Sequence, residues 1–253
     1  MRDTVDMDEV LVARPGLVPY EDARLLQKRI EAARQEGRLP DVLLLLEHPP
    51  VYTKGRRAEA GELGMGEDWY RMQGIEVCET DRGGRVTYHG PGQLVAYPIV
   101  SLKPYGDNVH EYVRRLERLM VDSLAAYGLA AGVIDGLTGV WVGGPPPGGR
   151  KIGSIGVHVS RGVTTHGLAI NVNNDLQPFE WVVPCGIEGV RMTSVCRELG
   201  ARHQMGRAGA RPRMMDDLMD DVAGRFGEIF GREPVEIAPE ELAERLGEPA
   251  SVR

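Results

Sequence analysis

A run of five aliphatic residues, Val42–Leu46, constrains the fold of this chain more than any other feature. The run has no polar residue at alternate positions, as a strand with one face in water would have. Asp41 precedes it and Glu47-His48-Pro49-Pro50 follows, so the chain must leave the sheet at that point. The run therefore predicts a central β-strand that is buried on both faces.

Hydrophobic periodicity predicts the other elements. Amphipathic helices are expected at Tyr20–Glu36, from an N-cap at Asp107 to a stop at Gly128, and at Asp216–Phe230. Further strands are expected at Val10–Val12, Ile75–Glu79, Leu94–Val100 and Val140–Val142. Loops or connectors are expected at residues 55–68, Gly143–Gly149 and Arg207–Arg213, with one short helix in Pro239–Gly247. Because strands and helices are interspersed without strict βαβ alternation, we expect one α/β or α+β domain with a mixed sheet.

The stretch from Gly149 to Val190 carries the residue types of a nucleophilic site. Two β-rich runs, Lys151–Val159 and Thr164–Val172, are joined at Ser160-Arg161-Gly162, which predicts a hairpin with a glycine turn. Lys151 begins the first run, and Cys185 follows the second between Pro184 and Gly186. A thiol in a tight turn and a cation on a strand are what acyl transfer through a thioester requires.

The composition excludes several classes of protein. With 253 residues, 42% of them hydrophobic and 26% charged, the chain is typical of soluble globular proteins. No apolar run is long enough to span a membrane, and acids replace the bases of a secretory signal near the N-terminus, so we expect a cytoplasmic protein. Three cysteines without CxxC spacing argue against a disulfide scaffold or a zinc site. A net charge of −7 argues against nucleic-acid binding.

Basic residues nevertheless form local clusters, at Arg56-Arg57, at Arg82 with Arg85, and at Arg150-Lys151 with Arg161. An acidic partner could dock on such clusters, although a solvated surface is the commoner interpretation.

Glycines, histidines and the other cysteines give weaker signals. The glycines of residues 81–93 allow either a close approach of backbone to a ligand or a simple hairpin turn. His158 and His166 lie on the two strands of the predicted hairpin and could pair, but structural histidines are the simpler interpretation. Cys78 and Cys196 have apolar surroundings and are interpreted as packing residues.

Four separated motifs together resemble one protein family. They are EHPPVYTKG at 47–55, RGGRVTYHGPGQLVAYPI at 82–99, RKIGSIGVHVSRGVTTHGLAINV at 150–172 and PCGIEGVRMTSV at 184–195. In this order they resemble the octanoyl-[acyl carrier protein]:protein octanoyltransferases, which are related to the lipoate and biotin protein ligases. The resemblance runs from about Val10 to Phe230 and leaves out loop 143–149 and the chain after residue 231.

The resemblance implies a fold and a reaction. The fold would be a mixed β-sheet with a smaller second sheet and flanking helices, in a catalytic domain over residues 1–230 followed by a tail over 231–253. The reaction would move octanoyl from acyl carrier protein to a lysine of lipoyl domains, on 2-oxoacid dehydrogenase subunits and on the glycine cleavage H protein. No cofactor, metal or ATP would be needed, because the thioester is already activated. The enzyme is expected to be a monomer.

The resemblance also implies the site residues. Cys185 matches the acyl-thioester nucleophile, and Lys151 matches the lysine that lowers the pKa of that thiol, as an adjacent ammonium does. His158 lies where many relatives carry a basic residue. Three segments match those that line the acyl substrate: Arg82, Gly83, Gly84, Arg85, Val86, Thr87, Tyr88 and His89; Ser154, Ile155 and Gly156; and Gly167, Leu168 and Ala169.

Three other functions remain as alternatives. An ATP-dependent lipoate or biotin ligase on the same fold would adenylate a free acid and would not need Cys185. A binder of lipoyl domains or carrier proteins would need neither Lys151 nor Cys185. An amidotransferase between lipoyl domains would use the same thioester chemistry, and only its donor would differ.

Overall fold

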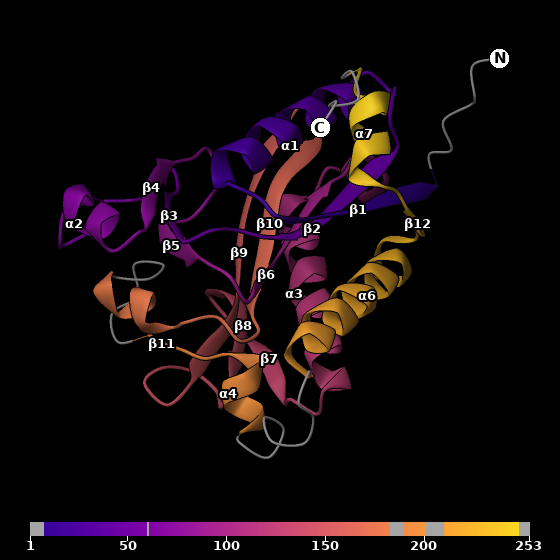
Figure 1. The fold of residues 1–253 in the computed structure, drawn as a ribbon. Helices are drawn as coiled ribbons and strands as arrows, with labels where there is room; N and C mark the ends of the chain where they lie inside the picture. The colour runs from indigo at the N-terminus through magenta and orange to yellow at the C-terminus, as the bar shows by residue number, and fades with distance from the viewer. Residues whose placement is uncertain (1–7, 60, 183–189, 201–209, 248–253) are drawn as a thin grey trace.

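The computed structural model of the protein describes residues 8–59, 61–182, 190–200 and 210–247, which form two β-sheets with helices around them (Figure 1). The larger sheet is mixed, with strand order β12-β1-β2-β6-β10-β9-β8-β7, and β11 pairs with β9 beside this path. Its strands are β1 (Glu9–Leu17), β2 (Asp41–Glu47), β6 (Gln93–Ile99), β7 (Ala131–Ile134), β8 (Leu137–Val142), β9 (Arg150–Ser160), β10 (Val163–Asn171), β11 (Arg191–Met192) and β12 (Glu233–Glu236).

The aliphatic run forms β2, between β1 and β6, and is buried on both faces as predicted. Alternate side chains of a strand point to opposite faces, so Leu43 and Leu45 enter one apolar cluster and Val42, Leu44 and Leu46 enter the other. Packing helices on both faces of the sheet is what this pattern requires.

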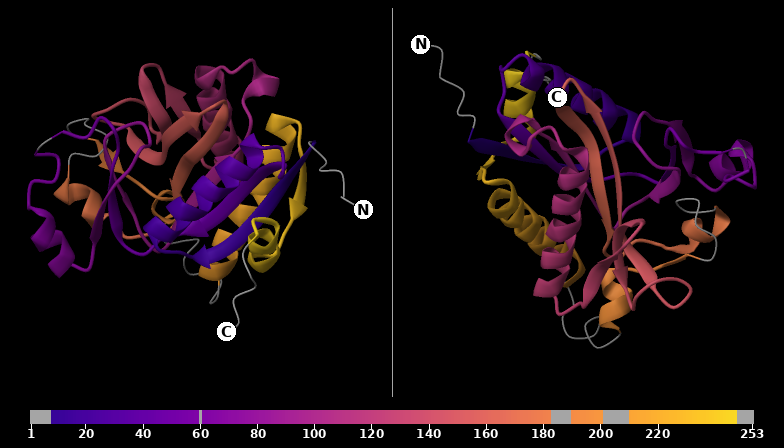
Figure 2. Two further views of the ribbon diagram at one scale, coloured as in Figure 1. Left: turned by 90° about the horizontal axis from the view of Figure 1, so that it is seen from above. Right: turned by 180° about the vertical axis from the view of Figure 1, so that it is seen from behind.

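Helices cover the two faces of the large sheet. α1 (Tyr20–Gln35) packs on β10 and β6, and α7 (Pro239–Arg245) packs on β1. α3 (Val109–Ala126) and α6 (Ala210–Phe230) pack against each other on the opposite face, as the two views of Figure 2 also show. Among the described residues, no helix combines the length and the apolar character that crossing a membrane requires.

A second, three-stranded sheet has the order β4-β3-β5, formed by β4 (Glu76–Glu79), β3 (Val51–Lys54) and β5 (Val86–His89). Its own apolar cluster joins it to α2 (Glu67–Met72) and to the 3₁₀-helix η2 (Gln177–Trp181). The predicted mixed sheet with a smaller sheet and flanking helices is therefore confirmed. A second 3₁₀-helix, η1 (Lys103–Tyr105), and the short helix α4 (Val195–Leu199) complete the described elements.

Three predicted boundaries are wrong for identifiable reasons. Asp107 is not the cap of α3: it has φ 54°, and the side chain of Asn108 accepts the first backbone N–H groups instead. α6 begins at Ala210, inside the expected connector, because Pro212 falls in the first helical turn, where no N–H donor is needed. α2 begins at Glu67, inside the expected loop 55–68.

The C-terminal segment contains the predicted short helix, α7, and an unpredicted strand. β12 pairs in parallel with β1 and holds Pro234, which an edge strand tolerates. Its four residues give no alternating hydrophobic signal, so the sequence could not reveal it. Ile237 and Leu242 enter the same apolar cluster as α1. A division of the chain at residue 230 stays a prediction.

Asp41 joins four distant parts of the fold. Its side chain is fully buried and accepts from Arg34 of α1 at 2.7 Å, from Arg232 beside β12 at 2.8 Å and from the backbone N–H of Ser101 at 3.0 Å. Both guanidinium groups are nearly buried too, so loss of this carboxylate removes the hydrogen-bonded charge partner of each.

We expect Asp41→Ala to lower the free energy of unfolding by about 3–5 kcal/mol, because it leaves two buried positive charges uncompensated. Urea unfolding at pH 7 measures this change. The matched control is Asp220→Ala, which breaks an exposed ion pair with Arg14 and should cost less than about 1 kcal/mol. Equal losses in the two variants would contradict the buried role of Asp41.

Candidate active site

The hairpin β9–β10 brings two of the predicted substrate segments into direct register. Ser154 pairs with Ala169, Ile155 with Leu168, and Gly156 with Gly167. The turn is as predicted: Arg161 and Gly162 both have positive φ, at 47° and 75°. Segments that are more than ten residues apart in the chain thus form one continuous wall.

The third segment, residues 82–89, crosses this wall at Gly156. The N–H of Gly83 donates to the carbonyl of Val157 at 2.9 Å. A Cβ on Gly156 would lie 3.0 Å from Cδ of Arg82 and 3.1 Å from the carbonyl oxygen of Gly83. Glycine at residue 156 therefore lets the two segments come this close without a shift of either one.

Arg82 fixes its own segment to the small sheet. Its guanidinium is buried and donates to the carbonyl oxygen of Thr53 at 2.6 Å, to the Thr53 hydroxyl at 2.7 Å and to the carbonyl oxygen of Gly83 at 2.9 Å. A planar donor fork suits this arrangement of acceptors, and lysine could not reproduce it.

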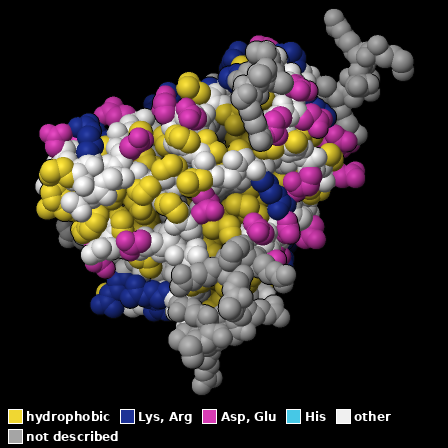
Figure 3. Space-filling model, in the orientation of Figure 1, with side chains coloured by type: hydrophobic (Ala, Val, Ile, Leu, Met, Phe, Trp, Pro, Cys, Tyr) yellow, Lys and Arg dark blue, Asp and Glu magenta, His cyan; other side chains and the backbone are white. Residues whose placement is uncertain are grey.

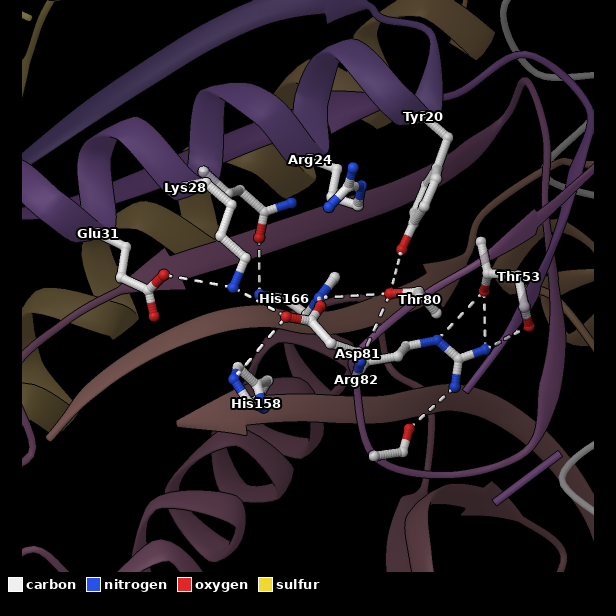
Figure 4. Close-up of polar contacts among 12 residues, drawn as sticks. Tyr20, Arg24, Lys28, Glu31, Thr53, Thr80, Asp81, Arg82, His158 and His166 are labelled. Atoms are coloured by element: carbon white, nitrogen blue, oxygen red, sulfur yellow. Dashed lines mark hydrogen bonds and ion pairs between the residues drawn. The ribbon is translucent and has the colours of Figure 1, made fainter. Parts of the chain in front are cut away.

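Asp81 holds the other side of the same segment, as Figure 4 shows. Its carboxylate accepts from Nε2 of His166 at 2.7 Å and from Lys28 of α1 at 2.8 Å, and it lies 3.8 Å from His158. The hydrogen bond from His166, together with Lys28, holds the pKa of Asp81 well below its usual range. The two histidines thus meet through Asp81 and form no metal-ligand pair with each other.

These segments surround a cavity of about 1500 Å³. Every predicted substrate-lining residue borders it except Tyr88. The Tyr88 ring packs instead on Phe179, with 5.4 Å between ring centroids, because alternate residues of β5 face opposite sides. Residues that the sequence did not single out also border the cavity. They are Tyr20 and Tyr97, one face of α3 from Val109 to Val121, residues 132–138 of β7, β8 and the turn that joins them, and Ala58, Glu59 and Val157.

Lys151 lies on β9 at the edge of this cavity. Its side chain is only 3% exposed, and its Nζ lies 5.3 Å from the centroid of the Trp141 ring. β11 runs in parallel beside β9, with Met192 opposite Lys151, and the N–H of Thr193 donates to the Lys151 carbonyl at 2.9 Å.

Cys185 lies outside the described residues, but both flanks of its segment are described. On one side, η2 is held by β3 of the small sheet and by α2: the Tyr52 hydroxyl of β3 donates to the carbonyl of Pro178 at 2.6 Å, and the Tyr70 hydroxyl of α2 donates to that of Trp181 at 2.9 Å. On the other side, β11 is paired with the strand that carries Lys151. Of the other cysteines, Cys78 is on β4, where burial raises the pKa of its thiol, and Cys196 is in α4; both are partly exposed, and their role as packing residues stays a prediction.

The base of the cavity is a buried polar network. Nδ1 of His89 donates to Gln93 Oε1 at 2.6 Å, and the Gln93 amide donates to Asn171 Oδ1 at 2.9 Å. Burial lowers the pKa of His89 well below its ordinary value, so this imidazole is neutral. His48 behaves alike: Nδ1 donates to the Val18 carbonyl, Nε2 accepts from the Tyr97 hydroxyl, and burial lowers its pKa to about 4.

The predicted basic clusters are only partly brought together. Arg56, Arg57, Arg82 and Arg85 border the cavity. Arg150 does not: it pairs with Glu198 of α4 at 2.7 Å. On the face drawn in Figure 3, acidic side chains are widely spread and basic ones occur in separate groups.

Comparisons with known proteins agree with this geometry. The family described as the lipoyl protein ligase A/B catalytic domain matches residues 19–219. An octanoyltransferase of Myxococcus xanthus is 44% identical over 234 residues, which cover 92% of this chain and 63% of that protein's length. An octanoyltransferase of Rubrobacter xylanophilus is 50% identical over 188 residues, which cover 74% of this chain and 82% of that protein.

Among solved structures, a bi-partite lipoate protein ligase from Thermoplasma acidophilum is similar with a TM-score of 0.68 at 19% identity. The similarity covers 95% of this chain and 91% of that one, and at this identity it concerns the fold alone.

The fold and the family match define the class, which is the catalytic domain shared by lipoyl ligases and octanoyltransferases. Within that class, the identities of 44% and 50% show that the chain belongs to the octanoyltransferase family. The predicted family and the predicted acyltransferase class are thereby confirmed.

His48 makes stability depend on pH in a defined direction. Its pKa is about 4 in the folded protein and about 6.5 in an unfolded chain. Its contribution to the free energy of unfolding is therefore fully present above pH 6.5 and is lost as the pH falls toward 4. We expect the free energy of unfolding to fall by about 2 kcal/mol between pH 7.5 and pH 5 from this residue alone.

Urea unfolding at both pH values measures the change. His48→Gln should be less stable at pH 7.5 but should lose about 2 kcal/mol less on going to pH 5. His110→Gln, at an exposed histidine of α3, is the matched control and should follow the wild-type pH dependence. An equal loss of unfolding free energy between pH 7.5 and pH 5 in His48→Gln and the wild type would contradict a buried neutral imidazole.

Proposed function

We propose that this enzyme transfers octanoyl from the phosphopantetheine thioester of acyl carrier protein to a specific lysine of lipoyl domains, through a thioester on Cys185. The acceptors would be the lipoyl domains of 2-oxoacid dehydrogenase subunits and the glycine cleavage H protein. The main supporting observation is Lys151, a buried cation at the cavity edge whose strand pairs with β11. Cys185 precedes Arg191 of β11 by six residues and follows Val182 by three.

The first half-reaction forms the acyl-enzyme. The Cys185 thiolate, stabilised by the Lys151 ammonium, attacks the thioester carbonyl of the donor. The bond between the acyl carbon and the pantetheine sulfur breaks, and the departing thiolate takes a proton from Lys151. Lys151 is then a neutral amine, and octanoyl is bound to Cys185.

The second half-reaction reverses the movement of the proton. The lysine amine of the lipoyl domain attacks the Cys185 thioester and gives its proton to neutral Lys151. The carbon–sulfur bond breaks, so the thiolate and the ammonium are regenerated together with an amide. This cycle requires a residue at position 151 that can both carry and release a proton.

The wall of β9 and β10 suits an unbranched acyl chain. Ile155 and Leu168 supply apolar surface at the cavity, while Gly156 and Gly167 allow Arg82 and Ala96 to lie close against the strands. Burying the six methylenes of an octanoyl group contributes roughly 5 kcal/mol, at about 0.8 kcal/mol each.

A covalent octanoyl adduct on Cys185 is the direct test. Incubation with octanoyl-acyl carrier protein, without ATP and without acceptor, should add one octanoyl mass to the peptide that contains residue 185. The adduct should be absent in Cys185→Ser and retained in Cys78→Ser and Cys196→Ser. An adduct elsewhere, or a requirement for ATP, would contradict the proposal and would favour a ligase.

Two substitutions separate the two roles of Lys151. Lys151→Arg keeps the positive charge but cannot release a proton, since the pKa of arginine exceeds about 12. We expect Cys185 of this variant to be alkylated at pH 7 as in the wild type. Transfer of octanoyl should be at least about 100-fold slower. Lys151→Met should lose both activities, with alkylation of Cys185 moved to higher pH because the favourable charge is absent.

The measurements are the pH dependence of Cys185 alkylation and single-turnover transfer to a lipoyl domain. Full transfer by Lys151→Arg would contradict the proton-transfer role. An unchanged alkylation profile in Lys151→Met would contradict the influence of the lysine on the thiol.

A further inference from the structure

Trp141 of β8 contacts Lys151 in a way that the proposed reaction does not yet use. The Nζ of Lys151 lies 5.3 Å from the centroid of the indole ring. The two side chains are 3% and 1% exposed, so the contact is shielded from water. An ammonium over the face of a tryptophan is attracted by the ring quadrupole, by up to about 2 kcal/mol when water is excluded.

The strand pairing fixes this contact. Trp141 pairs with Lys151 across β8 and β9, next to a register shift between Val140 and Trp141. The ring N–H lies 3.4 Å from the carbonyl oxygen of Leu137, to which it donates. Trp141 does not itself border the cavity, whereas Lys151 does, so any effect of the ring on the reaction must pass through the lysine.

The backbone at Gly139 packs against the Lys151 side chain from another side. Gly139 has φ 113°, and a Cβ at this position would lie 2.8 Å from Cε of Lys151 and 2.5 Å from the carbonyl oxygen of Gly153. The Gly139 N–H donates to Oε1 of Glu117 on α3 at 3.0 Å. The Lys151 side chain thus runs between an aromatic ring and a backbone that is fixed to the neighbouring helix.

We propose that Trp141 is a positioning residue for Lys151, and that its ring holds the buried Nζ in place at the cavity. The catalytic meaning of this inference rests on the proposed function. An ammonium held over an aromatic face is confined by its attraction to the ring. A confined ammonium is what the Cys185 thiolate would need before acylation.

The reactivity of the lysine itself tests the proposal independently of catalysis. Acetic anhydride reacts with the free amine, so the rate of Lys151 acetylation at a fixed pH, followed by mass spectrometry, reports how firmly the ring holds the amine. Trp141→Leu should raise this rate several-fold, because the aromatic face is lost. Trp141→Phe retains a ring face and should raise it by less than half as much. Equal rates in all three proteins would overturn the proposal.

The second readout is the pH dependence of Cys185 alkylation in a double-mutant cycle. Trp141→Leu alone should move the alkylation midpoint upward and slow single-turnover acylation about 10-fold, with the KM for the donor within twofold of the wild type. In the Lys151→Met background, Trp141→Leu should have no further effect on alkylation. An equal effect in both backgrounds would mean that Trp141 only fills space, which would overturn the proposal.

The two hypotheses fail in different ways. A wild-type enzyme that forms no octanoyl adduct would refute the proposed function, yet the acetylation rates would still decide the role of Trp141. Trp141→Tyr should retain most of the wild-type protection of Lys151 from acetylation because it also presents an aromatic face. Failure of both aromatic variants to differ from Trp141→Leu would exclude the ring as the cause.

Discussion

The hydrogen bonds that pair β9 with β10 are the interaction on which the site depends. They set Ser154, Ile155 and Gly156 opposite Ala169, Leu168 and Gly167. They also fix the position of Val157, whose carbonyl accepts from Gly83 and so brings the third segment onto the hairpin. A shift of one residue in this pairing would turn every side chain of the wall to the other face of the sheet.

Two sets of polar contacts, made by Arg82 and by Asp81, hold the segment before β5 from opposite sides. Arg82 reaches Thr53 in the small sheet, while Asp81 reaches Lys28 of α1 and His166 of β10. The segment is thereby tied to the small sheet, the large sheet and a helix at once (Figure 4). The Arg82 guanidinium is buried and needs hydrogen-bond partners with good geometry, which Thr53 and Gly83 provide, whereas Lys28 and Asp81 are 32% and 34% exposed.

The fold explains how one architecture can serve related acyl chemistry. The sheet and its helices resemble those of a lipoate protein ligase at low sequence identity, so the scaffold alone does not decide between an activated acid and a thioester donor. At the edge of the cavity, Lys151 lies between β11 and Trp141.

The sequence by itself determined the central strand, the hairpin and the family. Val42–Leu46 could only be a strand covered on both faces, and Arg161-Gly162 supplied the two positive φ angles of the turn. These features depend on local periodicity and backbone preference, which neighbouring residues encode. The motifs of the family also indicated the segments that border the cavity.

Only the tertiary structure decided which of these residues meet, because contacts between distant segments leave no periodic signal in the chain. It placed Tyr88 in a separate apolar cluster and Asp81 between two histidines. It added the face of α3 and residues 132–138 to the cavity, and β12 to the edge of the sheet. It also placed the Trp141 ring beside the Lys151 Nζ. The two residues are ten positions apart in the chain, and the proline-rich loop between them gives no indication that they touch. That contact exists because β8 and β9 pair across the loop, and pairing is set by the packing of the whole sheet.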